Sequence, residues 1–167
     1  WAVMAGAEVI STASNSSDRD LCLALGAKAV VNHREENWGQ QVLVATSGKK
    51  VDRVIDVEFG ANLPQILGCI APNGVIATYS STQVKTPSLP FLDMMYMDLT
   101  LRMVIVYAMP ESAKQAAIAA ISIALEQEQL EHRVAHVVPL EKISKAHELI
   151  EIGGFGGCVV VSMESSE

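Results

Sequence analysis

The sequence contains few cysteines, few aromatic residues and no excess of positive charge. Its three cysteines are Cys22, Cys69 and Cys158, which form no Cys-x-x-Cys pair, so we expect reduced, mostly buried thiols in a cytoplasmic protein. The formal net charge of −7 provides no general attraction to phosphate backbones or anionic lipids, which argues against nucleic-acid and membrane partners. Half of the residues are apolar and 19% are charged, which is the composition of a globular domain.

No segment has the pattern of a membrane span. The longest uncharged run, residues 59–84, contains Pro64, Gly68 and the turn Pro72-Asn73-Gly74. We therefore expect this run to divide into a helix, a turn and a strand. No secretory signal is visible, and the chain starts at Trp1.

A glycine-rich phosphate loop is also missing. The motif Gly-x-Gly-x-x-Gly joins the first strand of a dinucleotide-binding βαβ unit to its helix, and it does not occur here. Residues 1–6 have the pattern of the last turns of such a helix, ended by Gly6. We expect the first strand and the glycine turn to lie upstream of Trp1.

Residues 7–13 form the most informative segment. They predict an apolar strand that ends at Ala13 and Ser14, and Arg19 follows in the next helix. At the end of the second strand of a βαβ unit, an acidic residue would accept the ribose hydroxyls of NAD, whereas its absence beside an arginine suits the 2′-phosphate of NADP. The segment therefore predicts a preference for NADPH.

Strand and helix patterns alternate along the first half of the chain. Ser17 and Asp20 have the spacing of a capping box, and Gly26 ends the helix that they open. Further strands are predicted at 28–32, 51–57 and 74–79, and helices at 36–46 and 61–70. Strands joined by single helices predict right-handed crossovers. The expected fold class is α/β, a doubly wound parallel sheet of the Rossmann type without its first strand and glycine turn.

The pattern changes in the second half. A proline-bearing connection over 83–93 leads to an apolar strand predicted over 99–107 and to a helix that begins at Pro110. The tail predicts a strand over 133–138, a helix over 140–152 and a strand over 158–162.

Four segments carry a resemblance to the medium-chain dehydrogenases/reductases, closest to the NADPH:quinone oxidoreductase branch. They are LGAKAVVNHREE at 25–36, GKKVDRVIDV at 48–57, IAPNGVI at 70–76 and VPLEKISKAHE at 138–148. The resemblance implies a nucleotide-binding Rossmann domain over 1–125 and, over 126–167, a C-terminal segment that rejoins a GroES-like catalytic domain. It also implies that most of the catalytic domain precedes Trp1, so these residues alone are expected to be inactive and to bind NADPH poorly.

Polar residues at the first strand ends are candidate cofactor contacts. The resemblance places 2′-phosphate contacts at Ser14, Asn15 and Arg19, and the alternative is an ordinary polar turn with a solvated arginine. Asp18 stands where relatives often have lysine; it would repel a phosphate if turned inward, or serve the helix N-terminus. His33 stands where many relatives have tyrosine near the same phosphate, and a loop histidine without a role is the alternative.

A second group of candidates follows the later strands. Ser80 and Ser81 end a predicted strand, at the edge where parallel sheets bind ligands, although relatives often have glycine in place of Ser80. By resemblance, Val104 and Val106 belong to a strand whose backbone flanks the nicotinamide, while their side chains alone indicate a core strand. Cys158 replaces a lysine that relatives commonly carry, so one cofactor contact is expected to be lost.

No metal site is predicted in these residues. His132 and His136 would share one face of a helix, but their segment has the pattern of a strand, in which four residues span about 13 Å. Zinc ligands of related dehydrogenases lie mainly upstream. His147 falls on one helical face with Leu140 and Ile143 and is expected to be packed.

Two apolar features indicate assembly or substrate contacts. The cluster Met94-Met95-Tyr96-Met97 fits either a core or subunit interface, or an apolar wall for a flat substrate. The predicted strand over 101–107 is a candidate dimer edge, because the resemblance implies pairing of that strand across a twofold axis.

The residues and the resemblance together predict a cytoplasmic, zinc-independent, NADPH-dependent quinone oxidoreductase that forms a homodimer. The nicotinamide would transfer a hydride to a quinone or similar conjugated carbonyl. No side chain stands out as a general acid or base, so the catalytic residues are unknown. Two alternatives stay open: a zinc-dependent alcohol dehydrogenase, and a catalytically silent NADPH-binding protein with a structural role.

Overall fold

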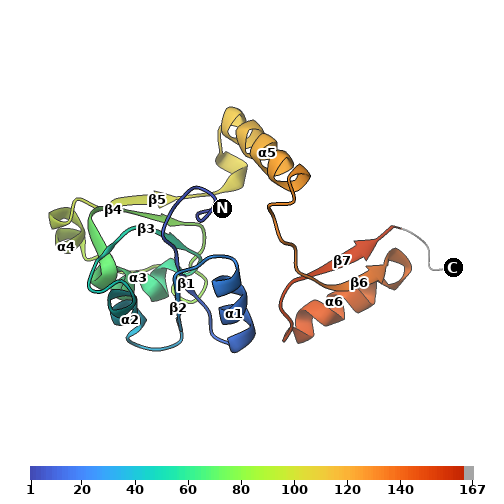
Figure 1. Cartoon of the computed structure of the whole chain (residues 1–167), viewed down its shortest axis with the longest axis horizontal. Coiled ribbons are helices and arrows are strands. Elements are labelled where there is room, and N and C mark those ends of the chain that lie inside the picture. Colours follow the sequence, from blue (N-terminus) through green and yellow to red (C-terminus); the bar gives the residue numbers. More distant parts are fainter. Residues whose placement is uncertain (164–167) are drawn as a thin grey trace. The chain divides into compact units, whose positions relative to one another are not determined.

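The chain divides into two compact units. The computed structural model describes residues 1–163. The first unit comprises Trp1–Met109 and the second begins at Pro110 (Figure 1). This division follows contacts within the chain, and the domain boundary expected after residue 125 stays a prediction.

Parallel strands form two sheets in the first unit. β1 (Ile10–Thr12) pairs with β2 (Ala29–Val31), and β4 (Ile70–Thr78) lies between β3 (Val51–Asp56) and β5 (Thr100–Met103). All three pairings are parallel, so the carboxyl ends of the strands share one edge within each sheet. The predicted α/β class with parallel strands is confirmed.

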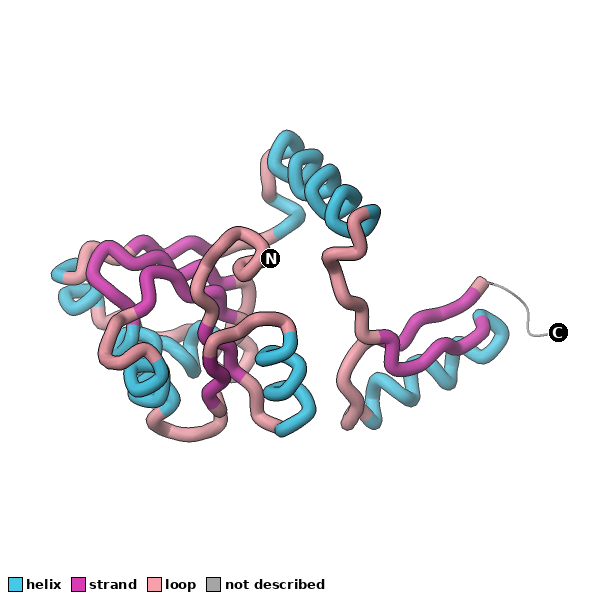
Figure 2. Tube along the Cα trace, viewed as in Figure 1, coloured by secondary structure: helices cyan, strands magenta, loops and turns pink. Residues whose placement is uncertain are grey.

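Helices alternate with these strands (Figure 2). They are α1 (Ser16–Ala24), α2 (Trp38–Ala45), α3 (Phe59–Cys69) and α4 (Phe91–Tyr96). Parallel neighbours need such crossovers, because a tight turn cannot connect the end of one strand to the start of a parallel one. Within the described residues, no helix is long and apolar enough to cross a lipid bilayer.

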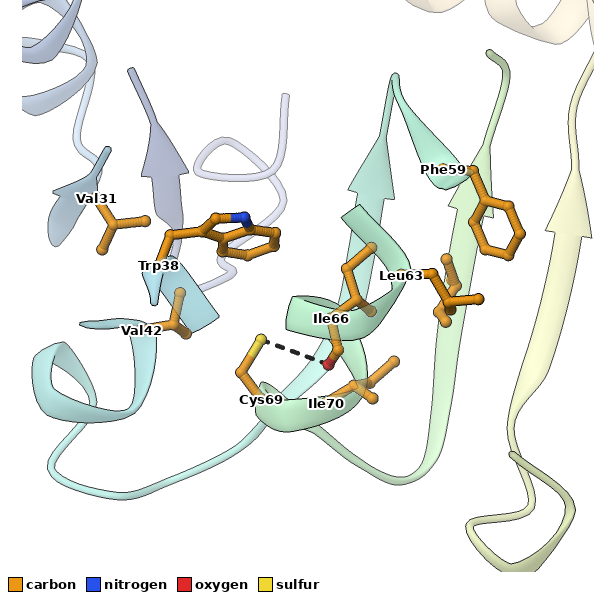
Figure 3. Packing of buried hydrophobic residues seen from close by; sticks show 9 residues of the cluster. Val31, Trp38, Val42, Phe59, Leu63, Ile66, Cys69 and Ile70 are labelled. Atoms are coloured by element: carbon orange, nitrogen blue, oxygen red, sulfur yellow. Dashed lines mark hydrogen bonds between the residues drawn. The ribbon is translucent and has the colours of Figure 1, made fainter. Parts of the chain in front are cut away.

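The core of the first unit lies where α2 packs against α3, and where α3 packs against β3 and β4 (Figure 1). Trp38 and Val42 from α2 and Leu63 and Ile66 from α3 belong to one buried cluster (Figure 3). Each pair is three or four residues apart, so each helix presents one apolar face. Ile76 contributes from β4 and is fully buried. This packing fixes α3, whose first turn borders the candidate site.

Asn15 is the N-cap of α1, and the predicted capping box of Ser17 and Asp20 is not formed. Its side-chain oxygen accepts a hydrogen bond from the Asp18 backbone N–H at 2.9 Å, and its Nδ2 donates to the Asp18 carboxylate at 2.8 Å. An N-cap side chain of this kind satisfies a helix donor that would otherwise lack a partner. The capping-box assignment is therefore wrong by two residues.

The first residues form the helical end that the sequence predicts. The backbone N–H of Ala7 donates to the carbonyl of Ala2, and that of Gly6 donates to the carbonyl of Val3, both at 2.9 Å. Gly6 has a φ of +81°. The two bonds and the positive φ define a Schellman motif, in which glycine is preferred because it has no side chain to clash.

β4 is longer than predicted. It begins at Ile70, directly after α3, and the turn Pro72-Asn73-Gly74 forms an irregularity inside it where the register with β3 shifts. The Asn73 N–H donates to the carbonyl of Met97 at 2.8 Å, and Asn73 has a φ of +61°. The uncharged run does divide into helix and strand, although Pro64 lies inside α3.

β5 is shorter than the strand predicted over 99–107. It ends at Met103, the Val104 N–H still donates to β4, and Val106–Ala108 forms a 3₁₀ helix, η1. Val106 is 56% exposed. The prediction of a core strand through Val106 is wrong, because the chain leaves the sheet after Val104.

Between residues 110 and 163, the second unit contains one parallel strand pair. β6 (Val134–Pro139) pairs with β7 (Cys158–Ser162), and α6 (Ile143–Ile152) connects them after the 3₁₀ turn η2 (Leu140–Lys142). A longer helix, α5 (Glu111–Glu126), precedes them in this unit. The predicted order of strand, helix and strand in the tail is confirmed.

The second unit buries few side chains. Among its described residues, the buried apolar side chains are Ala124, Val138 and Ala146. His147 is exposed, so its predicted packing is wrong: α6 buries the neighbouring Ala146 instead. His136 lies in β6, and its ring meets that of Phe155 edge-on, with centroids 5.0 Å apart.

The three thiols are free but have different surroundings. Cys69 is buried, Cys22 is half-buried and Cys158 is exposed, so the expectation that most are buried is wrong. The Cys69 thiol donates to the Ile66 carbonyl at 3.5 Å (Figure 3). Burial raises the pKa of Cys69, which keeps this thiol protonated and unreactive.

Candidate functional site

Ser14 and His33 lie at the same edge of the β1–β2 pair. Thr12 is in register with Val31, and the Ala13 N–H extends the pairing by donating to the Val31 carbonyl at 3.0 Å. Ser14 is half-buried and His33 is exposed. Both residues therefore lie at the carboxyl edge of this strand pair, as the sequence predicts. Their contact with a cofactor stays a prediction.

The Asn15 side chain is engaged by the start of α1. Both its amide oxygen and its amide nitrogen bond to Asp18, so a ligand contact through this side chain would compete with the helix cap. Asp18 adopts the second of its two expected roles, because its carboxylate turns toward Asn15 in the first helical turn. A carboxylate there also interacts favourably with the helix dipole.

Arg19 supplies a cation at this edge. Its side chain is 57% exposed, and its Nη1 lies 3.7 Å from Oδ1 of Asp20. An exposed ion pair of this kind contributes about 0–1 kcal/mol. The guanidinium can therefore turn to a phosphate at little cost.

A buried polar network joins the carboxyl ends of β3 and β4. The carboxylate of Asp56, which is 6% exposed, accepts hydrogen bonds from Asn62 Nδ2 at 2.7 Å and from Thr78 Oγ1 at 3.4 Å. Buried carboxylates are tolerated when they are hydrogen-bonded, so the network ties both strand ends to α3. Our sequence reasoning missed it, although polar residues that end two neighbouring apolar strands were a usable signal.

The loop after β4 bonds to the first turn of α3. The Phe59 N–H donates to the Ser80 carbonyl at 3.0 Å, and the Gly60 N–H donates to Ser81 Oγ at 2.9 Å. The Ser81 hydroxyl in turn donates to the Val84 carbonyl at 2.5 Å. Because the Ser81 hydroxyl is engaged within the chain, its contribution to a cofactor site would come from its backbone.

Val104 and Val106 separate in the structure. The Val104 N–H donates to the Thr78 carbonyl at 2.8 Å, which holds Val104 beside the end of β4. Val106 lies in η1, beyond the end of β5. The fold therefore brings Val104, but not Val106, to the carboxyl edge of the sheet, where Ser80 and Ser81 follow β4.

A hollow of about 370 Å³ lies between α3 and the segment that leads to α4. It is lined by Gly60, Leu63, Pro64, Leu67, Ser88 and Pro90. The residues over 94–97, considered as a substrate wall, do not line it: Met97 packs against the core, and Tyr96 is 80% exposed. The cluster is thus divided between core and surface.

The histidine, cysteine and acidic side chains that the structure describes do not gather into a metal site. Within residues 1–163, no group of three or more His, Cys, Asp or Glu side chains could hold a metal ion. His136 lies on a strand, as the sequence predicts, and contacts Phe155. No zinc-dependent step is assigned to these residues.

Comparison with known proteins places this geometry in a family. A family model for zinc-binding dehydrogenases matches residues 1–122. The quinone oxidoreductase of Sus scrofa is 28% identical over 144 residues, which cover 86% of this chain and 43% of that protein. The 2-haloacrylate reductase of Burkholderia sp is 33% identical over 79 residues, which cover 47% of this chain and 24% of that protein. The chain spans less than half the length of these relatives.

Solved structures agree in fold. A crystal structure of an NAD-dependent alcohol dehydrogenase matches with a TM-score of 0.78 at 27% identity, over 98% of this chain and 46% of that one. The structure of a 2-haloacrylate reductase matches with a TM-score of 0.86 at 24% identity, over 98% of this chain and 52% of that one. The Rossmann-type fold is confirmed, and the predicted resemblance to the quinone oxidoreductase branch of the medium-chain dehydrogenases/reductases is confirmed by the relatives of that name. Since its family model covers most of the chain, this protein belongs to the zinc-binding dehydrogenase family.

Proposed function

We propose that this chain is the nucleotide-binding part of a cytoplasmic, NADPH-dependent quinone oxidoreductase that works without zinc. The observation that carries the proposal is the edge of the β1–β2 pair, where the strand ends without an acid and Arg19 stands exposed in the next helix. Relatives named quinone oxidoreductases support the substrate class, a quinone or similar conjugated carbonyl.

The chemistry of this edge fits a 2′-phosphate better than a bare ribose. A phosphate offers three acceptor oxygens and negative charge, which suit a guanidinium. The ribose diol of NAD calls for a carboxylate acceptor at the strand end, where this chain has Ala13 and Ser14. The nearby carboxylate of Asp18 is held by Asn15, which lowers its competition for the same space.

The other residues of the proposed site bind and orient the cofactor. NADPH supplies the hydride when it is bound, and the protein contributes position and exclusion of water. We assign His33 to the adenosine side, because it shares an edge with Ser14. Ser80, Ser81 and Val104 are assigned to the nicotinamide side, where the ends of β4 and β5 meet.

Binding of the two cofactors by an Arg19→Ala variant tests the phosphate assignment. In protein expressed from its complete reading frame, calorimetry should show NADPH binding weakened roughly 10–150-fold, the factor for one lost charge-assisted hydrogen bond, and NADH binding nearly unchanged. Arg53→Ala is the matched control, because Arg53 is exposed on β3 before its carboxyl end. Equal weakening of both cofactors, or no NADPH binding by the wild type, overturns the proposal.

Quinone turnover separates the proposal from its two alternatives. NADPH oxidation with a quinone that persists after treatment with a zinc chelator supports a zinc-independent reductase. Loss of activity on chelation, with recovery on adding zinc, supports a zinc-dependent alcohol dehydrogenase. Tight NADPH binding without turnover of any carbonyl tested supports a catalytically silent structural protein.

We also propose that the protein is a homodimer formed through β5. In the described part of the chain, β5 pairs on one side only, with β4. Since the Val104 N–H points to β4, alternation along a parallel strand leaves the N–H groups of Met103 and Ile105 facing outward. An unpaired apolar edge is a liability that a second copy of the same strand would cover.

Proline substitutions distinguish the two sides of β5. Met103→Pro removes an outward donor and should dissociate the dimer while circular dichroism stays close to that of the wild type. Arg102→Pro removes a donor to β4 and should instead cost secondary structure. Light scattering reports the assembly, and a wild type that is monomeric at about 50 μM, well above usual dissociation constants of stable dimers, rules this interface out.

A further inference from the structure

Glu58, the residue before α3, binds the loop that follows β4. Its Oε2 accepts hydrogen bonds from the Thr82 N–H at 2.9 Å and from Thr82 Oγ1 at 2.6 Å, and its Oε1 accepts one from the Gln83 N–H at 3.0 Å. Two adjacent residues thus direct three donors to one carboxylate. A carboxylate is an acceptor at both oxygens, which a neutral amide of the same size cannot reproduce.

The loop after β4 also bonds directly to the first turn of α3. Ser80 and Ser81 accept hydrogen bonds from the first two N–H groups of α3. A Cβ atom at Gly60 would lie only 2.4 Å from the Val84 carbonyl oxygen, so the approach requires glycine at this position. The loop over 80–84 is therefore fastened to α3 through both its backbone and the Glu58 side chain.

The ionised form of Glu58 makes these contacts. The Thr82 hydroxyl, followed by backbone N–H groups of the loop, lowers the pKa of this carboxyl below its ordinary value, so it is charged at neutral pH. Hydrogen bonds to a charged acceptor are stronger than those between neutral groups. The clamp is thus fully formed under physiological conditions.

We propose that Glu58 is a positioning residue that holds the backbone of residues 80–83 against the nicotinamide half of the bound dinucleotide. This inference rests on the proposed function. The hydroxyls of Ser81 and Thr82 are engaged within the chain, so the loop contacts a cofactor mainly through backbone groups. The position of those backbone groups is what the Glu58 carboxylate determines.

Three variants isolate this role. Glu58→Gln keeps the size of the side chain but turns an N–H₂ group toward one of the loop donors. Glu58→Asp keeps the charge on a shorter side chain, so its KM and Kd for NADPH should lie between those of Glu58→Gln and those of the wild type. Glu151→Gln is the matched control, because it removes the same charge from an exposed position on α6.

The measurements combine steady-state kinetics with hydrogen exchange on protein from the complete reading frame. For Glu58→Gln we expect the KM and Kd for NADPH to rise about tenfold, the order expected for loss of one hydrogen bond to a charged group. We expect kcat at saturating NADPH to be unchanged and the amides of Thr82 and Gln83 to exchange faster without cofactor. If the variant only destabilised the fold, the fraction of active protein and therefore the apparent kcat would fall, and KM would be unchanged.

The outcomes are distinguishable. Faster exchange in the loop with unchanged KM and Kd overturns the positioning role, while NADPH binding by the wild type leaves the proposed function standing. Unchanged exchange in Glu58→Gln overturns the clamp itself. A wild type that binds no NADPH overturns the proposed function, and the positioning role with it, whatever the exchange rates show.

Discussion

The two units of this chain use their apolar residues differently. In the first unit, α2, α3 and β4 close one core, and Ile66, Ile70 and Ile76 are fully buried. In the second unit, the β6–β7 pair leaves Val137 63% exposed, and Ile150 on α6 is 62% exposed. Parallel strands are usually covered on both faces, so the second unit has the strands of a parallel sheet without a core of matching size.

This difference separates the tendency to form a strand from burial. β7 has the sequence Cys-Val-Val-Val-Ser, and β-branched residues favour extended backbone through their restricted side chains. Burial depends instead on whether other elements lie against the strand. The second unit therefore shows that an apolar strand can form in this chain without a buried core around it.

The largest expected effect tests the comparison directly. Ile66→Ala should lower the free energy of unfolding by about 2–5 kcal/mol, because it leaves a cavity in a packed core. In the chain of residues 1–167, Ile150→Ala, on the exposed face of α6, should change it by less than about 0.5 kcal/mol. Urea unfolding followed by circular dichroism measures both. Equal losses would mean that the face of α6 is covered in the protein, and the comparison would fail.

A smaller effect is expected within the first unit. Asp56→Asn places an amide N–H₂ against the donor of Asn62 and should cost about 1–3 kcal/mol, since buried donors are left without acceptors. Asp52→Asn, at an exposed position of the same strand, should be nearly neutral. Thermal unfolding of the two variants sharpens the comparison between buried and exposed polar groups. A neutral Asp56→Asn would show that the network does not hold the strand ends.

The smallest effect concerns the start of α1. Asn15→Ala removes the observed cap and should cost about 1 kcal/mol, whereas Ser17→Ala, inside α1, should cause no loss, because alanine favours a helix more than serine does. Differences of this size shift the thermal midpoint by a few degrees in a domain of this length. If Ser17→Ala costs as much as Asn15→Ala, the helix starts where the capping-box spacing predicts.

The errors of the sequence-based predictions have a common cause. The order of the strands and of the longer helices follows from local periodicity and is correct in both units, but the short helix α4 was not predicted. The end of β5 at Met103, the exposure of His147 and the choice of Asn15 over Ser17 as cap each depend on which neighbours a residue meets. A periodic pattern cannot distinguish these outcomes, because apolar spacing is the same whether or not another element covers the face.

The candidate site divides in the same way. Ser14, Arg19 and Ser80 could be proposed as candidates because strand ends in a parallel sheet are predictable positions. The Asp56 network and the Glu58 clamp were not, since Glu58 and Thr82 are 24 residues apart in the chain. Their meeting depends on the crossover through α3, which returns β4 beside β3.

The sequence by itself determined the α/β class, the parallel order and the acid-free end of β1, because these are properties of short segments. Only the tertiary structure decided that Ser81 bonds to α3, that Asp18 bonds to Asn15, and that one carboxylate holds the loop after β4. The physical reason is that hydrogen-bond partners and burial are set by distances between segments. Those distances exist only once the helices have packed on the sheet.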